Sequence, residues 1–290
     1  MIKTRRQLWL YPLFQVPLML MAACLIIAAL GWLLNWGRPT VAVAIALDFS
    51  DSTLGAVRQQ EIKAVNSYLQ QNQELNKPNQ IQIFGFASKV KPLTDDFKAD
   101  SKQVRKELDR SLQNSNLDKN LGGGTNFNLA IERGSNALGL VEKRCRELLI
   151  VTDGIADVSE SVINRAVDSQ VKINAVVLGG KESKAIQKAT RQTEGIYLQD
   201  EASNLEMLFT DKFFARFNSN IRWVMFWLAG AFISFMWMLI LPLDRWLFQG
   251  LMGLDMTLGG QLALANALFW SILTIVIVGK FWGLPFGASC

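Results

Sequence analysis

The stretch that decides the fold is VAVAIALDFSDS, which runs from Val41 to Ser52. Its first seven residues are all apolar, which is typical of a strand buried on both faces of a parallel sheet. Asp48, Ser50 and Ser52 follow where that strand should end. In an open α/β sheet, ligands bind beyond the carboxyl ends of the strands, so these oxygen ligands could converge on a hard cation such as Mg²⁺. Alternatively, Ser50, Asp51 or Ser52 could cap the following helix.

Two later stretches carry related features. Residues 122–126 (GGGTN) form a glycine loop ahead of a helical pattern, and residues 148–154 (LLIVTDG) form a second apolar run that ends in an acid. Together the three stretches resemble the metal-ion-dependent adhesion site of the von Willebrand factor type A (vWA) domain. That pattern is D-x-S-x-S on the first strand, a later Thr, and a later Asp at a strand end. It is filled without substitution by Asp48, Ser50, Ser52, Thr125 and Asp153.

The resemblance covers residues 40–217 and implies an α/β fold. The expected sheet is Rossmann-like, doubly wound and mostly parallel, with helices on both faces. The implied metal is Mg²⁺, with Mn²⁺ or Ca²⁺ as alternatives, and some of the five residues would act through water. The glycines ahead of Thr125 have no side chains and would let Thr125 approach the metal closely, although they could also be only a flexible turn.

Strands alternate with helices throughout this region, which independently favours a parallel sheet with helices on both faces. The expected strands are 81–86, 90–93, 147–152, 171–178 and 195–198. The expected helices are 53–71, 101–112, 127–138, 158–168, 182–191 and 202–217, and residues 114–120 are expected to be a polar loop. The helix 53–71 should bury one face, formed by Leu54, Val57, Ile62, Val65 and Leu69.

Composition excludes several classes of site. The chain has no histidine, so it lacks the commonest general base, a Ser-His-Asp triad and any His-ligated zinc site. Its three cysteines are far apart and form no metal or redox motif. The net charge is +5, but no lysine-arginine block indicates a nucleic acid partner.

Three apolar runs predict a multi-pass membrane protein. Residues 13–36, 222–243 and 256–279 are each long enough to span a bilayer. A cleaved signal peptide is the alternative for the first run, but the run is too long and ends in Trp36. The expected organisation is a basic flank (1–12), the first span, the vWA domain (40–217), the second span, a loop (244–255), the third span and a tail (280–290).

The charges beside the spans predict the orientation. Lys3, Arg5 and Arg6 precede the first span, and the positive-inside rule places that end in the cytoplasm. The domain would then lie in the periplasm or outside the cell, anchored in the inner (plasma) membrane. Basic residues on the domain side of the spans oppose this assignment, namely Arg38, Lys212, Arg216 and Arg222.

A binding module, not an enzyme, is the function that this ligand set favours. Only Asp48 and Asp153 carry charge, so a bound cation would favour a Glu or Asp from a protein partner. The arrangement resembles bacterial membrane-anchored vWA proteins of the Bat-like type, which implies complex assembly or stress response with a MoxR-type AAA+ ATPase. One alternative is a phosphotransfer enzyme with Asp48 as nucleophile, although Ser50 stands where a general acid is needed. Another is an accessory subunit of a channel or transporter.

Overall fold

The computed structural model describes residues 10–154, 157–179 and 182–285. The described chain divides into two compact units, one made of residues 39–218 and the other of residues 10–38 together with 219–285. The basic residues Lys3, Arg5 and Arg6, and the end of the expected tail from residue 286 on, lie outside the described residues.

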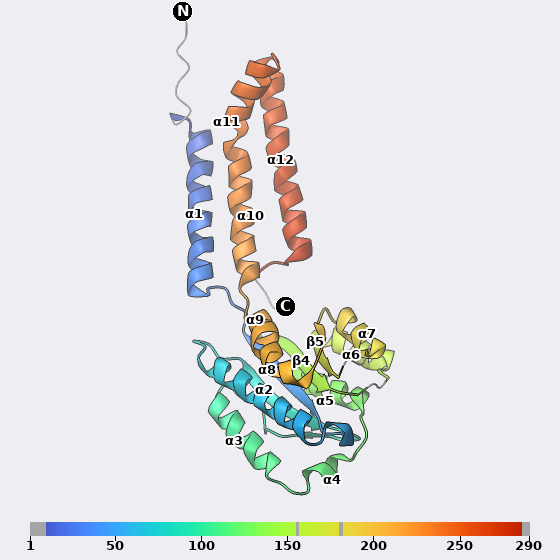
Figure 1. Ribbon diagram of the computed structural model, residues 1–290. Helices are drawn as coiled ribbons and strands as arrows, with labels where there is room; N and C mark the ends of the chain where they lie inside the picture. Colours follow the sequence, from blue (N-terminus) through green and yellow to red (C-terminus); the bar gives the residue numbers. More distant parts are fainter. Residues whose placement is uncertain (1–9, 155–156, 180–181, 286–290) are drawn as a thin grey trace, which may run out of the picture. The chain divides into compact units, whose positions relative to one another are not determined.

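The first unit is built on a six-stranded sheet with strand order β3-β2-β1-β4-β5-β6 (Figure 1). The strands are β1 (Val41–Asp48), β2 (Gln80–Phe86), β3 (Val90–Pro92), β4 (Cys145–Thr152), β5 (Val171–Leu178) and β6 (Tyr197–Asp200). All neighbouring strands pair in parallel except β2 and β3, which are antiparallel. The mostly parallel, doubly wound sheet is therefore confirmed.

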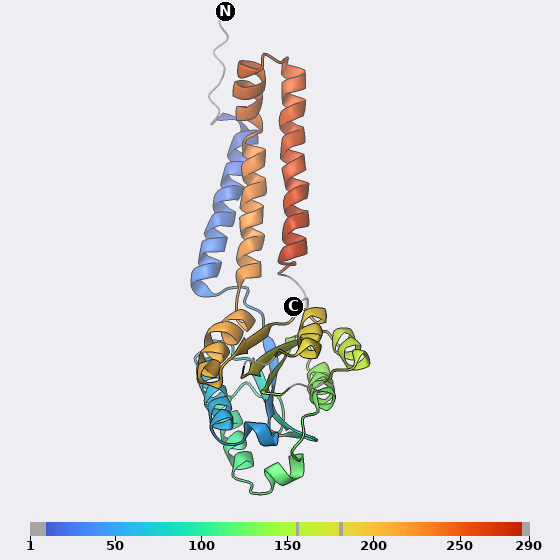
Figure 2. The same ribbon diagram turned by 45° about the vertical axis from the view of Figure 1, so that its right-hand side comes forward.

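Both faces of the sheet are covered, because alternate residues of β1 enter two separate cores. Val41, Val43, Ile45 and Leu47 face the core formed with α2 (Ala56–Gln73), α3 (Ser101–Leu112) and the last helical segment. Ala42, Ala44 and Ala46 face the core formed with α5 (Phe127–Gly139), α6 (Glu160–Asp168) and α7 (Lys184–Gln192). Figures 1 and 2 show these helix groups on opposite sides of the sheet.

The last helical segment of this unit is not a uniform α-helix. It runs through a short 3₁₀ turn (Ala202–Asn204), α8 (Leu205–Met207), the π-helical η4 (Leu208–Phe214) and α9 (Ala215–Phe217). Phe209 and Phe214 both contact the ring of Tyr68 from α2 edge-on, at centroid distances of 6.2 and 5.2 Å. The aromatic rings therefore fix this segment against α2.

Three local expectations differ from the structure. Residues 114–120 are not simply a loop, since α4 (Leu117–Leu121) forms there to bury Leu117 and Leu121. The helix expected at residue 53 begins at Ala56, and Leu54 is 54% exposed. The last strand starts at Tyr197 rather than at Gly195. Gly195 itself lies so close to the β5 backbone that a Cβ there would meet the Ile173 carbonyl oxygen at 1.8 Å.

The second unit consists of helices long and apolar enough to cross a membrane. The three candidate spans are Pro12–Leu34 (α1), Ile221–Leu251 and Met256–Phe281 (α12). The middle span comprises α10 (Ile221–Met238), α11 (Ile240–Pro242) and the π-helical η5 (Leu243–Leu251). Most of the loop expected at 244–255 is thus helical, because no glycine or proline interrupts the chain between Pro242 and Gly250.

Within this unit α10 packs against both α1 and α12 (Figure 1). Asn220, just before α10, donates through Nδ2 to the Gly31 carbonyl at 2.7 Å and to the Trp36 carbonyl at 3.2 Å. These bonds tie the start of α10 to the carbonyl of Gly31 in the last turn of α1 and to that of Trp36 just beyond it. On the other side, Trp237 donates through Nε1 to Ser271 Oγ of α12 at 3.1 Å.

Candidate metal centre

The predicted site residues lie where the strand order of the sheet reverses. The chain leaves β1 toward β2 and β3 on one side, whereas β4, β5 and β6 lie on the other. β1 and β4 are neighbours, so their carboxyl ends open side by side at the switch point where α/β folds bind ligands. Asp48 is the last residue of β1, and Asp153 directly follows β4.

Asp48 is completely buried, and both of its carboxylate oxygens are engaged. Oδ1 accepts from the backbone N–H of Ser50 at 2.9 Å, and Oδ2 accepts from Thr152 Oγ1 at 2.5 Å. Burial raises the pKa of the Asp48 carboxyl, the hydrogen bonds from Thr152 and Ser50 act to lower it, and the nearby Asp153 raises it further. The carboxylate is therefore held in one orientation at a cost in desolvation.

Hydroxyl groups connect Asp48 to Asp153. The Oγ atoms of Ser50 and Ser52 lie 3.2 Å apart, and Ser52 Oγ donates to Asp153 Oδ1 at 2.7 Å. Thr125 is adjacent, because its Oγ1 lies 3.5 Å from where a Cβ on Gly154 would stand. The structure thus brings Asp48, Ser50, Ser52, Thr125 and Asp153 together.

The loop that carries Thr125 is held on both sides. The Gly123 carbonyl accepts from the backbone N–H of Asp51 at 3.2 Å, and Gly124 donates to Ser88 Oγ at 3.0 Å. A Cβ at Gly123 would lie 2.2 Å from Asp51 Oδ2, so glycine lets the loop pass this side chain without displacing it. Asn126 then caps α5 by accepting from the backbone N–H of Leu129 at 3.1 Å.

The donor set fits a hard divalent cation. It offers two carboxylates and three hydroxyls, which suit Mg²⁺, Mn²⁺ or Ca²⁺ better than a metal that prefers sulfur or imidazole. Among the described residues, no group of three or more His, Cys, Asp or Glu could hold a metal, so hydroxyl groups would have to complete the shell.

A buried acid close to the centre supports the same fit. Glu61 of α2 is fully buried, and neither of its carboxylate oxygens has a hydrogen-bond partner. Burial raises the pKa of Glu61 well above its ordinary value, Asp48 and Asp153 raise it further, and Arg58 lowers it. Asp48 and Asp153 thus oppose ionisation of Glu61, and a cation bound by the two aspartates would offset their negative charge.

Sequence reasoning missed several supporting residues. Thr152 holds Asp48, and Thr53 Oγ1 donates to the Asp48 and Ser50 carbonyls at 2.7 and 2.9 Å. Glu61 carried a readable signal: it lies four residues from both Val57 and Val65, on the apolar face of its helix. A charged residue at such a position usually has a structural or functional partner. For Thr152, the only signal in the sequence was its position beside Asp153.

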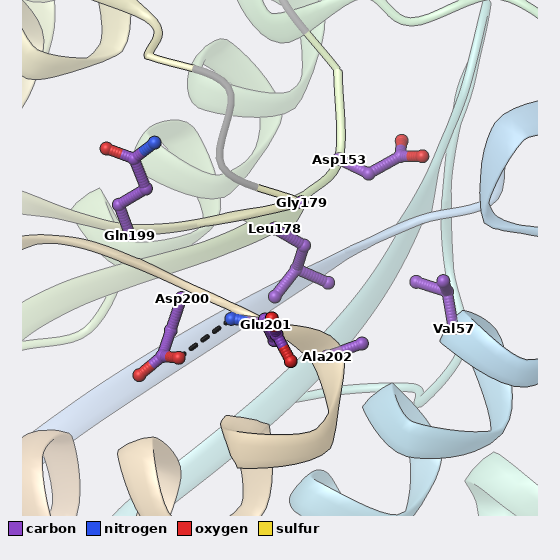
Figure 3. Close-up of a pocket in the computed structure, with 8 residues that line it drawn as sticks. All are labelled: Val57, Asp153, Leu178, Gly179, Gln199, Asp200, Glu201 and Ala202. Carbon is purple, nitrogen blue, oxygen red and sulfur yellow. Dashed lines mark hydrogen bonds between the residues drawn. The ribbon is translucent and has the colours of Figure 1, made fainter.

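Two hollows flank the centre. One, of about 680 Å³, is lined by Asp153 together with residues of α2, β5 and the end of β6 (Figure 3). The other, of about 420 Å³, is lined by Thr125 together with Ser88, Asn126, Asn128 and other neighbours. Each hollow is therefore lined by one of the five converging residues.

Comparison with known proteins adds a family match. Residues 43–156, which contain all five converging residues, match the family model described as von Willebrand factor type A domain. Comparison with curated proteins finds no match.

Solved structures share the fold at low identity. A von Willebrand factor type A protein from Catenulispora acidiphila is 14% identical with a TM-score of 0.51, over 62% of this chain and 43% of that one. An aerotolerance-related membrane protein from Bacteroides fragilis is 15% identical with a TM-score of 0.48, over 59% and 96% of the two chains. BatB from Bacteroides thetaiotaomicron is 16% identical with a TM-score of 0.46, over 61% and 99%. At these identities the likeness concerns the fold alone.

Proposed function

The chain contains a von Willebrand factor type A domain, and we propose that this domain binds a protein partner through one Mg²⁺ ion and an acidic residue of the partner. The observation that carries the proposal is the convergence of five oxygen-bearing side chains from three separate segments at the sheet's switch point. Asp48, Ser50, Ser52, Thr125 and Asp153 would hold the ion. Mn²⁺ or Ca²⁺ could replace Mg²⁺ with the same donors.

The charge balance of the site favours a partner carboxylate. Asp48 and Asp153 together neutralise a divalent cation, and the three hydroxyls add no charge. An ion with so little anionic charge in its shell supplies Lewis acidity toward a further carboxylate. The protein's own residues prepare this site, since Thr152 and the Ser50 amide orient Asp48 before any ligand arrives.

The same geometry weakens the phosphotransfer alternative. A nucleophilic Asp48 would need an accessible oxygen and a general acid, but Asp48 is completely buried and both of its oxygens accept hydrogen bonds. Ser50 occupies the position of the second acid, and a hydroxyl is a poor proton donor at neutral pH. The proposal is therefore a binding module rather than an enzyme.

The membrane spans suggest where the binding takes place. We assign the protein to the inner (plasma) membrane as a multi-pass protein, with the domain on the periplasmic or extracytoplasmic side. By resemblance to Bat-like membrane-anchored vWA proteins, the binding would serve protein complex assembly or stress response together with a MoxR-type AAA+ ATPase. In this orientation, an ATPase in the cytoplasm would reach only the segments at that side of the membrane.

Calorimetric titration of the full chain in detergent with Mg²⁺ tests the metal site. We expect one ion bound per chain, and no binding by the Asp48→Ala, Asp153→Ala double variant. The control is Asp109→Ala, Asp168→Ala, which removes the same charge from exposed helix positions. Equal Mg²⁺ affinity in wild type and the site variant would refute the assignment.

A further inference from the structure

The hollow on the β5 side of the centre is strongly acidic. It is lined by three carboxylate residues, Asp153, Asp200 and Glu201, and among the described residues that line it none is cationic (Figure 3). Asp200 Oδ1 accepts from the backbone N–H of Glu201 at 2.8 Å and from Asn204 Nδ2 at 2.7 Å, which fixes its carboxylate and lowers its pKa. Glu201 is exposed.

The rest of the same wall is largely apolar. Val57 of α2, Leu178 at the end of β5 and Ala202 after β6 all line the hollow. A volume of about 680 Å³ is ample for one long side chain. An aliphatic wall beside carboxylates suits lysine and arginine, which lay their stems on apolar surface and keep the charged end near acids.

The hollow on the other side of the centre differs in character. Its lining is mainly uncharged and polar, with Ser88, Thr125, Asn126 and Asn128, and it contains one acid, Asp157. The two recesses would therefore select different side chains, and a ligand lying across the centre would meet a strongly acidic wall on only one side.

The charges at the centre and in the hollow indicate which kind of ligand can bind there. With a divalent ion on Asp48 and Asp153 the centre is neutral, and a partner carboxylate makes it negative. Asp200 and Glu201 then add two more negative charges within the adjoining hollow. An acidic ligand without a compensating cation would meet like charges in this hollow, whereas a cationic side chain would be attracted to them.

We propose that this hollow binds a Lys or Arg side chain from the same partner segment whose acidic residue occupies the metal centre. The preferred partner is thus a protein segment that carries an acid and, on one side of it, a base. This inference rests on the proposed metal-dependent function, and it adds the specificity of that function.

Selection from a displayed library of random peptides tests the proposal and its premise separately. The full chain in detergent is the bait, once with Mg²⁺ and once with EDTA. We expect Mg²⁺ to enrich peptides with an Asp or Glu, and with a Lys or Arg at a preferred position on one side of it. A labelled peptide of the enriched sequence should bind Glu201→Gln about twofold to fivefold more weakly, as expected for loss of one exposed ion pair.

Three comparisons make the outcome decisive. Asp200→Asn keeps an acceptor oxygen for the turn and should weaken the same peptide. Glu142→Gln, an exposed change that precedes the amino end of β4, should not. Acid-containing peptides without any basic preference, or a preference unchanged in Glu201→Gln and Asp200→Asn, would overturn the inference and leave the proposed function standing. Failure of Mg²⁺ to enrich acidic peptides at all would overturn both.

Discussion

At the scale of single residues, Thr152 is the side chain that most directly prepares the centre. Its hydroxyl donates to Asp48 Oδ2 and accepts from the backbone N–H of Gly154 at 3.0 Å. One side chain therefore links the end of β1 to the turn that carries Asp153. Residues that orient a metal ligand in this way commonly matter almost as much as the ligand.

Thr152→Val should lower Mg²⁺ affinity while leaving the fold intact, because valine keeps the shape of threonine and removes the hydrogen bond. We expect a loss of about tenfold to a hundredfold, measured by calorimetry on the full chain. Thr210→Val, in η4, is the control. Unchanged affinity in Thr152→Val would show that Asp48 is positioned without its help.

Glu61 predicts an unusual dependence of stability on pH. Because its pKa is raised in the folded protein, the folded state holds a proton that the unfolded state releases. The stability contributed by this group is therefore fully present below the pKa of an unfolded glutamate, and it is lost as pH rises through the folded pKa. The groups acting on it are Asp48, Arg58 and Asp153.

Glu61→Gln should remove this loss of stability at higher pH, because glutamine does not ionise. In EDTA, we expect the variant to be more stable than wild type at neutral pH, by about 1–3 kcal/mol, and the difference to shrink as the pH is lowered. The full chain is unfolded in urea and the transition of residues 39–218 is monitored by circular dichroism. The free energy of unfolding obtained from this transition measures the difference. A variant less stable than wild type at neutral pH would mean that the ionised carboxylate stabilises the fold.

At the scale of elements, the pairing of α1 with α10 can be tested with a native thiol. Cys24 lies on α1, and a Cβ at Gly230 of α10 would stand 3.2 Å from its sulfur. A cysteine at position 230 would therefore place its sulfur next to Cys24 Sγ, and a disulfide needs the two sulfurs about 2.05 Å apart.

Gly230→Cys should therefore form an oxidant-dependent bond with Cys24. After proteolysis within residues 39–218, the fragments containing α1 and α10 should migrate together on a non-reducing gel and separate on reduction. Adding Cys24→Ser should abolish the link, and Gly260→Cys on α12, where nothing lies within 4 Å, should not form it. Absence of the link in Gly230→Cys would contradict the packing of these two helices.

At the scale of the whole molecule, the charges beside the spans predict which side of the membrane the domain occupies. The basic flank before the first span predicts a cytoplasmic N-terminus, and basic residues on the domain side of the first and second spans oppose it. A long domain crosses a membrane largely regardless of its own charges, so the flank should decide.

Protease added to intact spheroplasts should then digest residues 39–218. Digestion after detergent lysis serves as the control, since the domain is accessible there in either orientation. Full protection in intact spheroplasts would reverse the assignment and place the metal centre in the cytoplasm.

Much of this architecture follows from local sequence. The run Val41–Leu47 specifies a strand buried on both faces, because every residue is apolar and the structure buries each of them. Three apolar runs predict three candidate spans from length and composition alone. The order of Asp48, Ser50, Ser52, Thr125 and Asp153 along the chain was enough to predict their convergence, because an established pattern specifies that order.

Other features were decided only by the tertiary structure. Thr152 and Asp48 are 104 residues apart, and their hydrogen bond exists because β4 pairs beside β1 rather than elsewhere in the sheet. The burial of Glu61 and the acidic hollow at Asp200 and Glu201 likewise depend on which elements meet near the carboxyl ends of the strands. Periodicity encodes which face of an element is buried, but it does not encode the partner of that face. Long-range pairing creates such contacts, and so local sequence could not reveal them.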